Sequence, residues 1–114
     1  MTKIVFFKRD GLYTGFCAAG HSGYGVEGED IVCAAISVLT TNTINALDEL
    51  SKDEIEFGID EDEGYLCLNL KSNEDPASQI LMKALVMGLE GIRRDYGSKY
   101  CKVDYKEENA NVKA

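Results

Sequence analysis

The feature that most constrains the fold is a two-residue step, Asp10-Gly11, between two apolar runs near the N-terminus. The first run is "KIVFFKR" (3–9) and the second covers residues 13–19, and both are rich in residues that favour strands. Asp-Gly is a preferred pair for the tight turn of a hairpin, because both central positions of that turn need a positive φ. The chain is therefore expected to open with two antiparallel strands.

A second hairpin is predicted in the middle of the chain. Apolar side chains alternate with polar or small ones over residues 55–59 and again over residues 66–70. Such alternation is typical of strands with one buried face. The acidic segment "DEDEG" (60–64) lies between the two runs and is predicted to form the turn.

Two helices are predicted from apolar residues spaced about 3.6 residues apart. For the second helix, Asp75 is the expected N-cap and Pro76 the first helical residue. The apolar stripe of the first helix, in residues 31–50, consists of Val32, Ile36, Leu39, Leu47 and Leu50, with Thr43 on the same line. The stripe of the second helix consists of Ala77, Leu81, Ala84, Leu85, Gly88 and Ile92.

The order of elements defines the fold class. With a last strand at residues 99–105, the order is ββαββαβ, which predicts an α+β protein. A mostly antiparallel mixed sheet with both helices packed on one face would bury every apolar stripe. The 114 residues suit a single domain, expected over residues 1–105, followed by a polar C-terminal tail at 106–114.

The spacing of the cysteines and the net charge limit the kinds of ligand and partner that the protein is expected to bind. Four cysteines lie far apart, without the close pairs of zinc or redox motifs, so neither a metal nor a cofactor is expected. No export signal is apparent, so we expect reduced thiols in the cytoplasm, and we assign Cys17, Cys67 and Cys101 to packing. The net charge of −8 disfavours nucleic acid and would attract a basic partner. No apolar run suggests a membrane span.

Cys33 differs from the other cysteines because it lies near the predicted start of the first helix. With Asp30 as N-cap, Cys33 is the third helical residue, where unpaired backbone amides and the helix dipole stabilise a thiolate. On a helical wheel Cys33 shares a polar face with Asp30, Ser37, Thr40 and Thr41, beside the apolar stripe. The position favours a reactive thiol, although most unpaired cysteines are packing residues.

His21, the one histidine of the chain, follows the predicted second strand. A histidine near a cysteine can hold a thiolate–imidazolium pair and later donate a proton to a leaving group. The loop between them contains spaced glycines, which either serve tight turns or let the loop open for a polypeptide substrate. These glycines are Gly23, Gly25 and Gly28, together with Gly20 directly before His21.

Two further polar residues near Cys33 each allow two interpretations. Asp30 either orients His21 or serves only as the helix cap. Ser37, one turn beyond Cys33, either assists the substrate or the Cys–His pair, or bonds back to a helix carbonyl.

The segment "GHSGYGVEGEDIVCAAIS" (20–37) resembles the signature of the ribosomal-processing cysteine protease family, Prp, of Firmicutes and related bacteria. The resemblance extends over the whole chain, and the matching positions are Gly20, His21, Gly25, Gly28, Asp30, Ile31, Val32, Cys33, Ala34 and Ser37. It implies a cysteine endopeptidase with Cys33 as nucleophile and His21 as general base and acid. The implied substrate is the precursor of a large-subunit ribosomal protein, whose N-terminal extension is removed, and the implied assembly is a homodimer.

An alternative from another class is a non-catalytic ribosome-associated binding or assembly factor with a redox-sensitive cysteine. The two hypotheses differ in what happens when Cys33 is alkylated. An enzyme would lose turnover, whereas a binding module would still bind its partner.

Overall fold

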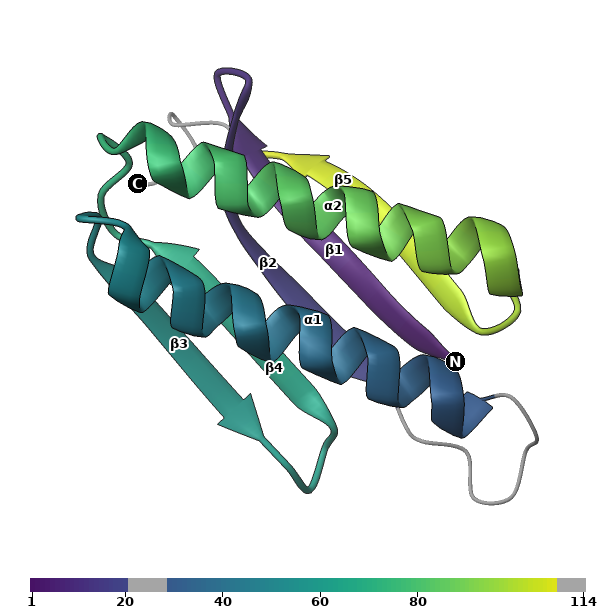
Figure 1. Ribbon diagram of the computed structural model, residues 1–114. Helices are drawn as coiled ribbons and strands as arrows, with labels where there is room; N and C mark the ends of the chain where they lie inside the picture. Colours follow the sequence, from purple (N-terminus) through teal and green to yellow (C-terminus); the bar gives the residue numbers. More distant parts are fainter. Residues whose placement is uncertain (21–28, 109–114) are drawn as a thin grey trace.

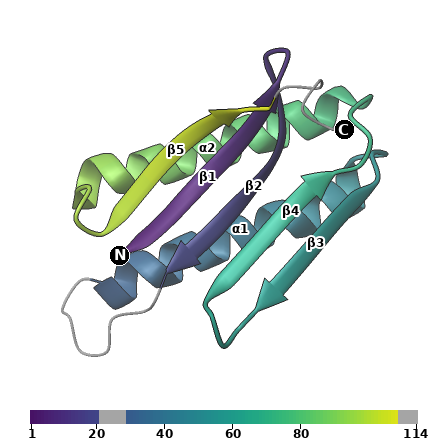
Figure 2. The ribbon, with the colours of Figure 1, turned by 180° about the vertical axis from the view of Figure 1, so that it is seen from behind.

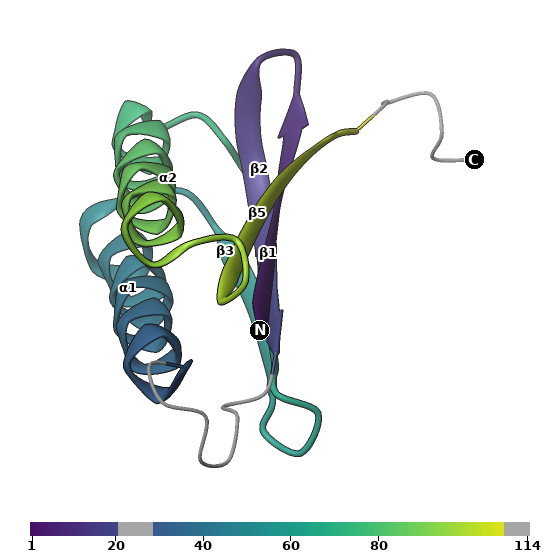
Figure 3. The ribbon, with the colours of Figure 1, turned by 90° about the vertical axis from the view of Figure 1, so that its right-hand side faces the viewer.

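A mixed β-sheet with both helices on one face forms the protein (Figure 1, Figure 3). The computed structural model describes residues 1–20 and 29–108, and within these ranges the chain has five strands and two helices in the predicted order. The elements are β1 (Thr2–Arg9), β2 (Leu12–Gly20), α1 (Glu29–Leu50), β3 (Ile55–Asp60), β4 (Tyr65–Leu70), α2 (Pro76–Tyr96) and β5 (Cys101–Glu107). The predicted α+β fold class is confirmed.

The strand order in the sheet is β3-β4-β2-β1-β5, and only the pairing of β1 with β5 is parallel. Both residues of the first turn have positive φ, 52° at Asp10 and 81° at Gly11, as the Asp-Gly step predicts. β5 continues two residues beyond the expected strand end, and the Glu108 backbone N–H donates to the Lys8 carbonyl. The polar tail therefore begins later than residue 106.

The core lies between the sheet and the two helices. β1 and β2 contribute Ile4, Phe6 and Phe16, each fully buried. The stripe of α1 is confirmed at four positions: Val32, Ile36, Thr43 and Leu47 are buried and face this layer, and Leu39 is half-buried. Burial was predicted wrongly at two places. One is Leu50, the last residue of α1, and the other is the edge strand β3, which α1 does not cover. The side chains left exposed there are Leu50, Phe57 and Ile59.

The predicted stripe of α2 is rotated by about one residue from the observed buried face. The buried side chains of α2 are Ser78, Met82, Leu85 and Leu89, whereas Ala84 is exposed. Gly88 instead faces α1, since an added Cβ would lie 3.0 Å from Leu39 Cδ1. Asp75 does cap this helix, accepting a hydrogen bond from the Ala77 N–H, and Pro76 is its first residue.

Two of the four cysteines are not the reduced packing residues that the sequence suggested. Cys17 and Cys67 form a disulfide, with their Cα atoms 4.1 Å apart. The reason is the register of β2 and β4, which places these residues directly opposite each other. Phe16 and Ala18, on either side of Cys17, are buried in the core, so the disulfide lies on the sheet face away from the helices. Figure 2 views the structure from that side. Cys33 and Cys101 remain thiols, and Cys101 is fully buried as expected.

The segment Ile31–Leu50 of α1 is long and apolar enough, by length and composition, to cross a membrane. This differs from the expectation that no apolar run suggests a membrane span. Val32, Ile36 and Leu47 are nevertheless buried in the core formed with the sheet and α2. We therefore interpret α1 as a core helix.

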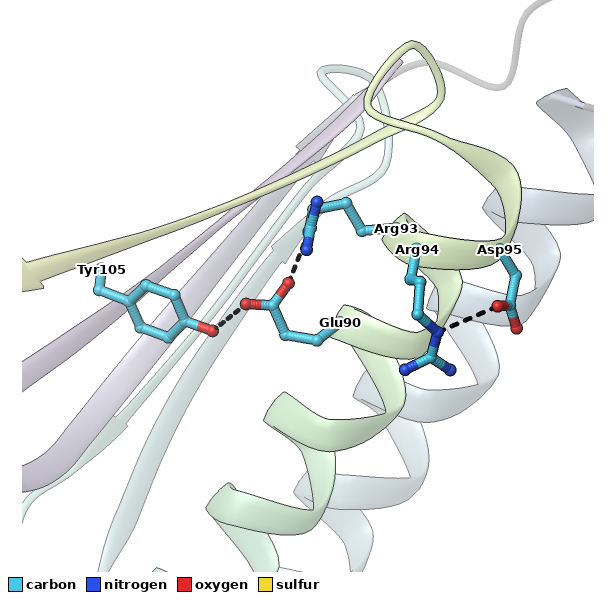
Figure 4. A network of polar contacts seen from close by, with 5 residues as sticks. All are labelled: Glu90, Arg93, Arg94, Asp95 and Tyr105. Atoms are coloured by element: carbon cyan, nitrogen blue, oxygen red, sulfur yellow. Dashed lines mark hydrogen bonds and ion pairs between the residues drawn. The ribbon is translucent and has the colours of Figure 1, made fainter.

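A polar network joins the end of α2 to β5 (Figure 4). Glu90 accepts hydrogen bonds of 2.6 Å from Tyr105 Oη and from Arg93 Nε. Burial and the bond to Glu90 raise the pKa of Tyr105 far above its usual range, while the bonds from Tyr105 and Arg93 lower the pKa of Glu90. Arg94 pairs with Asp95 on the exposed side. The network fixes β5, and with it β1, against α2.

Asp53 is a buried carboxylate that fastens the start of α2 to the connection after α1. It is 8% exposed and accepts hydrogen bonds from the hydroxyls of Ser72 and Ser78 and from the backbone N–H groups of Glu74 and Asp75. Burial alone would raise the pKa of Asp53, but these hydrogen bonds outweigh it and hold the pKa below its ordinary value.

We expect Asp53→Asn to lower the free energy of unfolding by about 2 kcal/mol at pH 7, because an amide cannot accept all four hydrogen bonds. The folded-state pKa of Asp53 is lowered, so its stabilisation is present above the unfolded pKa of about 3.9 and is lost as the pH falls through the folded value. Urea unfolding at pH 7 and below pH 4 measures this difference. The exposed Asp62→Asn is the control, and equal stability of the two variants at pH 7 would contradict the assignment.

Candidate active site

A groove runs between the N-terminal half of α1 and the hairpin of β3 and β4. Its volume is about 380 Å³. One wall is the polar face of α1, with Cys33, Ser37, Thr40 and Thr41, as the helical wheel predicts. The other wall and floor come from the hairpin and the end of β2, and include Ile59, Asp60, Glu61, Tyr65, Leu66 and Gly20.

Cys33 is half-buried in the α1 wall of this groove. α1 begins at Glu29, so Cys33 is its fifth residue and Asp30 its second. Asp30 is therefore not the N-cap that the sequence suggested. The spacing of apolar residues identifies the buried face of a helix, but it locates the first helical residue only to within one or two positions.

Ser37 and Thr40 lie beside Cys33 but differ in their surroundings. Ser37 is exposed and lines the groove one turn beyond the thiol. Thr40 is 2% exposed, and its hydroxyl donates to the Ile36 carbonyl at 2.9 Å. Thr40 thus bonds back to its own helix.

The thiol of Cys33 contacts Thr2, the first residue of β1. Thr2 Oγ1 lies 3.4 Å from Cys33 Sγ, which is within hydrogen-bond range for sulfur. Thr2 lies 31 positions from Cys33 in the sequence, so no local pattern predicts the contact. The packing of α1 over the sheet brings the two together.

Gly20 was predicted to belong to a substrate loop, and the structure instead makes it the last residue of β2. Its N–H donates to the Gly64 carbonyl at 3.1 Å. An added Cβ would lie 2.5 Å from the Met1 carbonyl oxygen and 2.6 Å from Thr2 Cα. Gly20 is therefore needed for the close approach of three backbone segments below Cys33.

His21, Gly23, Gly25 and Gly28 lie outside the described residues. His21 is joined by a peptide bond to Gly20, which lines the groove. Within the described ranges, no group of three or more His, Cys, Asp or Glu residues is arranged to hold a metal ion.

A thiol that lines a groove on the polar face of a helix can act as a nucleophile when a general base lies nearby. Comparison with known proteins agrees. Residues 1–102 match the model of the family described as cysteine protease Prp, and the chain belongs to this family. The protein is thus a cysteine peptidase.

Three relatives illustrate the similarity. The chain is 32% identical to the ribosomal processing cysteine protease Prp of Bacillus subtilis, over 71% of this chain and 76% of the relative. The structure of SMU.848 from Streptococcus mutans has a TM-score of 0.85 at 29% identity, covering 95% of this chain and 96% of that one. Prp from S. aureus, solved with a substrate peptide, has a TM-score of 0.86 at 22% identity, covering 93% and 100%, and supports the fold.

We expect Gly20→Ala to lower the free energy of unfolding by about 1–3 kcal/mol, because the methyl group would overlap backbone atoms that cannot move independently. Gly58→Ala is the matched control, since an added Cβ at this strand glycine meets nothing within 4 Å. Urea unfolding of both variants provides the test. Equal stability of the two would show that the three segments are not tightly packed.

Proposed function

We propose that this protein is a cysteine endopeptidase that removes the N-terminal extension of a large-subunit ribosomal protein precursor. The observation that carries the proposal is the placement of Cys33 in the wall of a peptide-sized groove in a member of the Prp family. Relatives named as ribosomal processing proteases support the substrate class. A further S. aureus structure, with a covalently linked product peptide, is consistent with a covalent mechanism.

In the proposed mechanism, Cys33 is the nucleophile and His21 the general base and acid. The Cys33 thiolate attacks the scissile carbonyl carbon, and the carbonyl electrons move to oxygen. When the tetrahedral intermediate collapses, the C–N bond breaks and the His21 imidazolium gives its proton to the leaving amine. Water, deprotonated by His21, then attacks the thioester, and Cys33 leaves as the thiolate.

The walls of the groove fit an extended peptide with both apolar and basic side chains. Ile59 and Leu66 provide apolar surface, and Asp60 and Glu61 provide negative charge at the hairpin end. The net charge of −8 adds a general attraction for a basic substrate. Hydroxyl groups on the opposite wall come from α1 and suit the peptide backbone.

Cys33→Ala is expected to abolish cleavage of the extended precursor while the melting temperature stays close to that of the unmodified protein. Cys33 is half-buried on the polar face of α1, so the loss of its sulfur leaves the core intact. Cys101→Ala is the control: this thiol is fully buried, and its loss should reduce stability and preserve the chemistry. The masses of both products measure cleavage. Cleavage near the normal rate in Cys33→Ala would overturn the nucleophile assignment.

The same assay separates the proposal from a non-catalytic ribosome-associated factor. Such a factor would bind the precursor without producing two fragments. His21→Ala is expected to lower turnover by about 10²–10⁴-fold, the usual range for general acid–base catalysis. We further propose that the enzyme acts as a homodimer, which the family resemblance implies, and that it works in the cytoplasm. Sedimentation analysis tests the dimer.

Glu61→Gln should raise the KM for a lysine-containing peptide about two- to fivefold at low salt, with little change in kcat. The reason is that an exposed carboxylate in the groove wall attracts the peptide without touching the reacting atoms. Glu49→Gln is the control, because it makes the same charge change on an exposed residue near the other end of α1. An equal rise in KM for both variants would indicate that only the net charge matters.

A further inference from the structure

We propose that Thr2 is a positioning residue for the Cys33 thiol. Its hydroxyl holds Cys33 Sγ in place and bonds to it in both the thiol and the thiolate form. This inference rests on the proposed function, in which Cys33 is the nucleophile. No motif in the sequence points to Thr2, and its role follows from the contact between β1 and α1.

The position of the Thr2 side chain is tightly fixed. Thr2 is 7% exposed, and its backbone N–H donates to the Tyr100 carbonyl at 3.0 Å. In the sheet it lies opposite Gly20 on one side and Cys101 on the other. Because β1 is hydrogen-bonded to a strand on each side, Thr2 cannot shift without disturbing both neighbours.

Because Gly20 has no side chain, the Thr2 hydroxyl can occupy the space beside it. A Cβ added to Gly20 would lie 3.0 Å from Thr2 Oγ1 and closer still to the Thr2 backbone. The hydroxyl is thus held between the end of β2 and the first turns of α1. From there, Oγ1 is 3.4 Å from Cys33 Sγ.

A hydroxyl suits this place because it both donates and accepts hydrogen bonds. Next to a neutral thiol, Thr2 Oγ1 can accept a hydrogen bond from the S–H group. Next to a thiolate, the same oxygen donates its own proton to sulfur, and a hydrogen bond to a charged group is the stronger kind. The contact therefore keeps Sγ aimed into the groove during the attack on the carbonyl.

The test compares Thr2→Val with Thr2→Ser. Valine keeps the branched shape and removes the hydroxyl, whereas serine keeps the hydroxyl. Thr43→Val is the matched control, because Thr43 is also 7% exposed and its hydroxyl donates to the Leu39 carbonyl within the core part of α1. Two rates are measured: kcat for the precursor peptide, and alkylation of native protein by iodoacetamide. Cys101 is fully buried and Cys17 and Cys67 are joined, so alkylation reports on Cys33.

We expect Thr2→Val to lower kcat and the alkylation rate about tenfold each, with KM changed less than twofold. Thr2→Ser should restore both rates to within about threefold of the unmodified protein, and Thr43→Val should change neither. If Thr2→Val does not fold, Thr2→Ala takes its place with the same expected losses.

Unchanged rates in a folded variant without the hydroxyl would overturn the inference. So would a Thr2→Ser variant as slow as Thr2→Val, since the methyl group and not the hydroxyl would then matter. The alkylation rate does not depend on peptide cleavage. If the unmodified protein cleaves no precursor, the proposed function fails, while the alkylation comparison still decides whether Thr2 controls the thiol.

Discussion

The candidate site depends on the close approach of three backbone segments at Gly20. The start of β1, the end of β2 and the turn between β3 and β4 meet there, at distances that leave no space for a side chain at this position. Gly64, with φ of 65°, completes the contact by accepting the Gly20 N–H. This junction is the floor below Cys33, so a change in it would move Thr2 and one end of the groove together.

α1 connects the fold to the chemistry because its two faces have different roles. Its apolar face packs against the sheet and against α2, and this packing fixes the rotation of the helix. Its polar face must then point toward the β3–β4 hairpin, where Cys33 and Ser37 line the groove. The hairpin extends beyond the area that α1 covers, which leaves Ile59 exposed as part of the opposite wall. The incomplete cover of the sheet thus creates room for a peptide.

Local signals in the sequence predicted the elements well, and contacts between distant residues less well. The turn signal of Asp10-Gly11 and the helix-start signal of Asp75-Pro76 depend only on neighbouring residues. The first turn and the start of α2 were therefore predicted correctly. The Cys17–Cys67 disulfide was missed because it depends on the register of β2 and β4 across 50 residues. Thr2 was missed for the same reason. In α2, the buried Ser78, whose hydroxyl donates to Asp53, breaks the apolar pattern from which the buried face was predicted.

Trapping the covalent intermediate is the most direct test of Cys33 as the nucleophile. The protein is mixed with the extended ribosomal precursor, quenched in acid within the first turnover, digested and examined by mass spectrometry. We expect an adduct in which the N-terminal extension is joined to Cys33 through a thioester. This adduct should disappear as the free extension accumulates. Release of both fragments without any adduct at Cys33, or with an adduct at another residue, would contradict it.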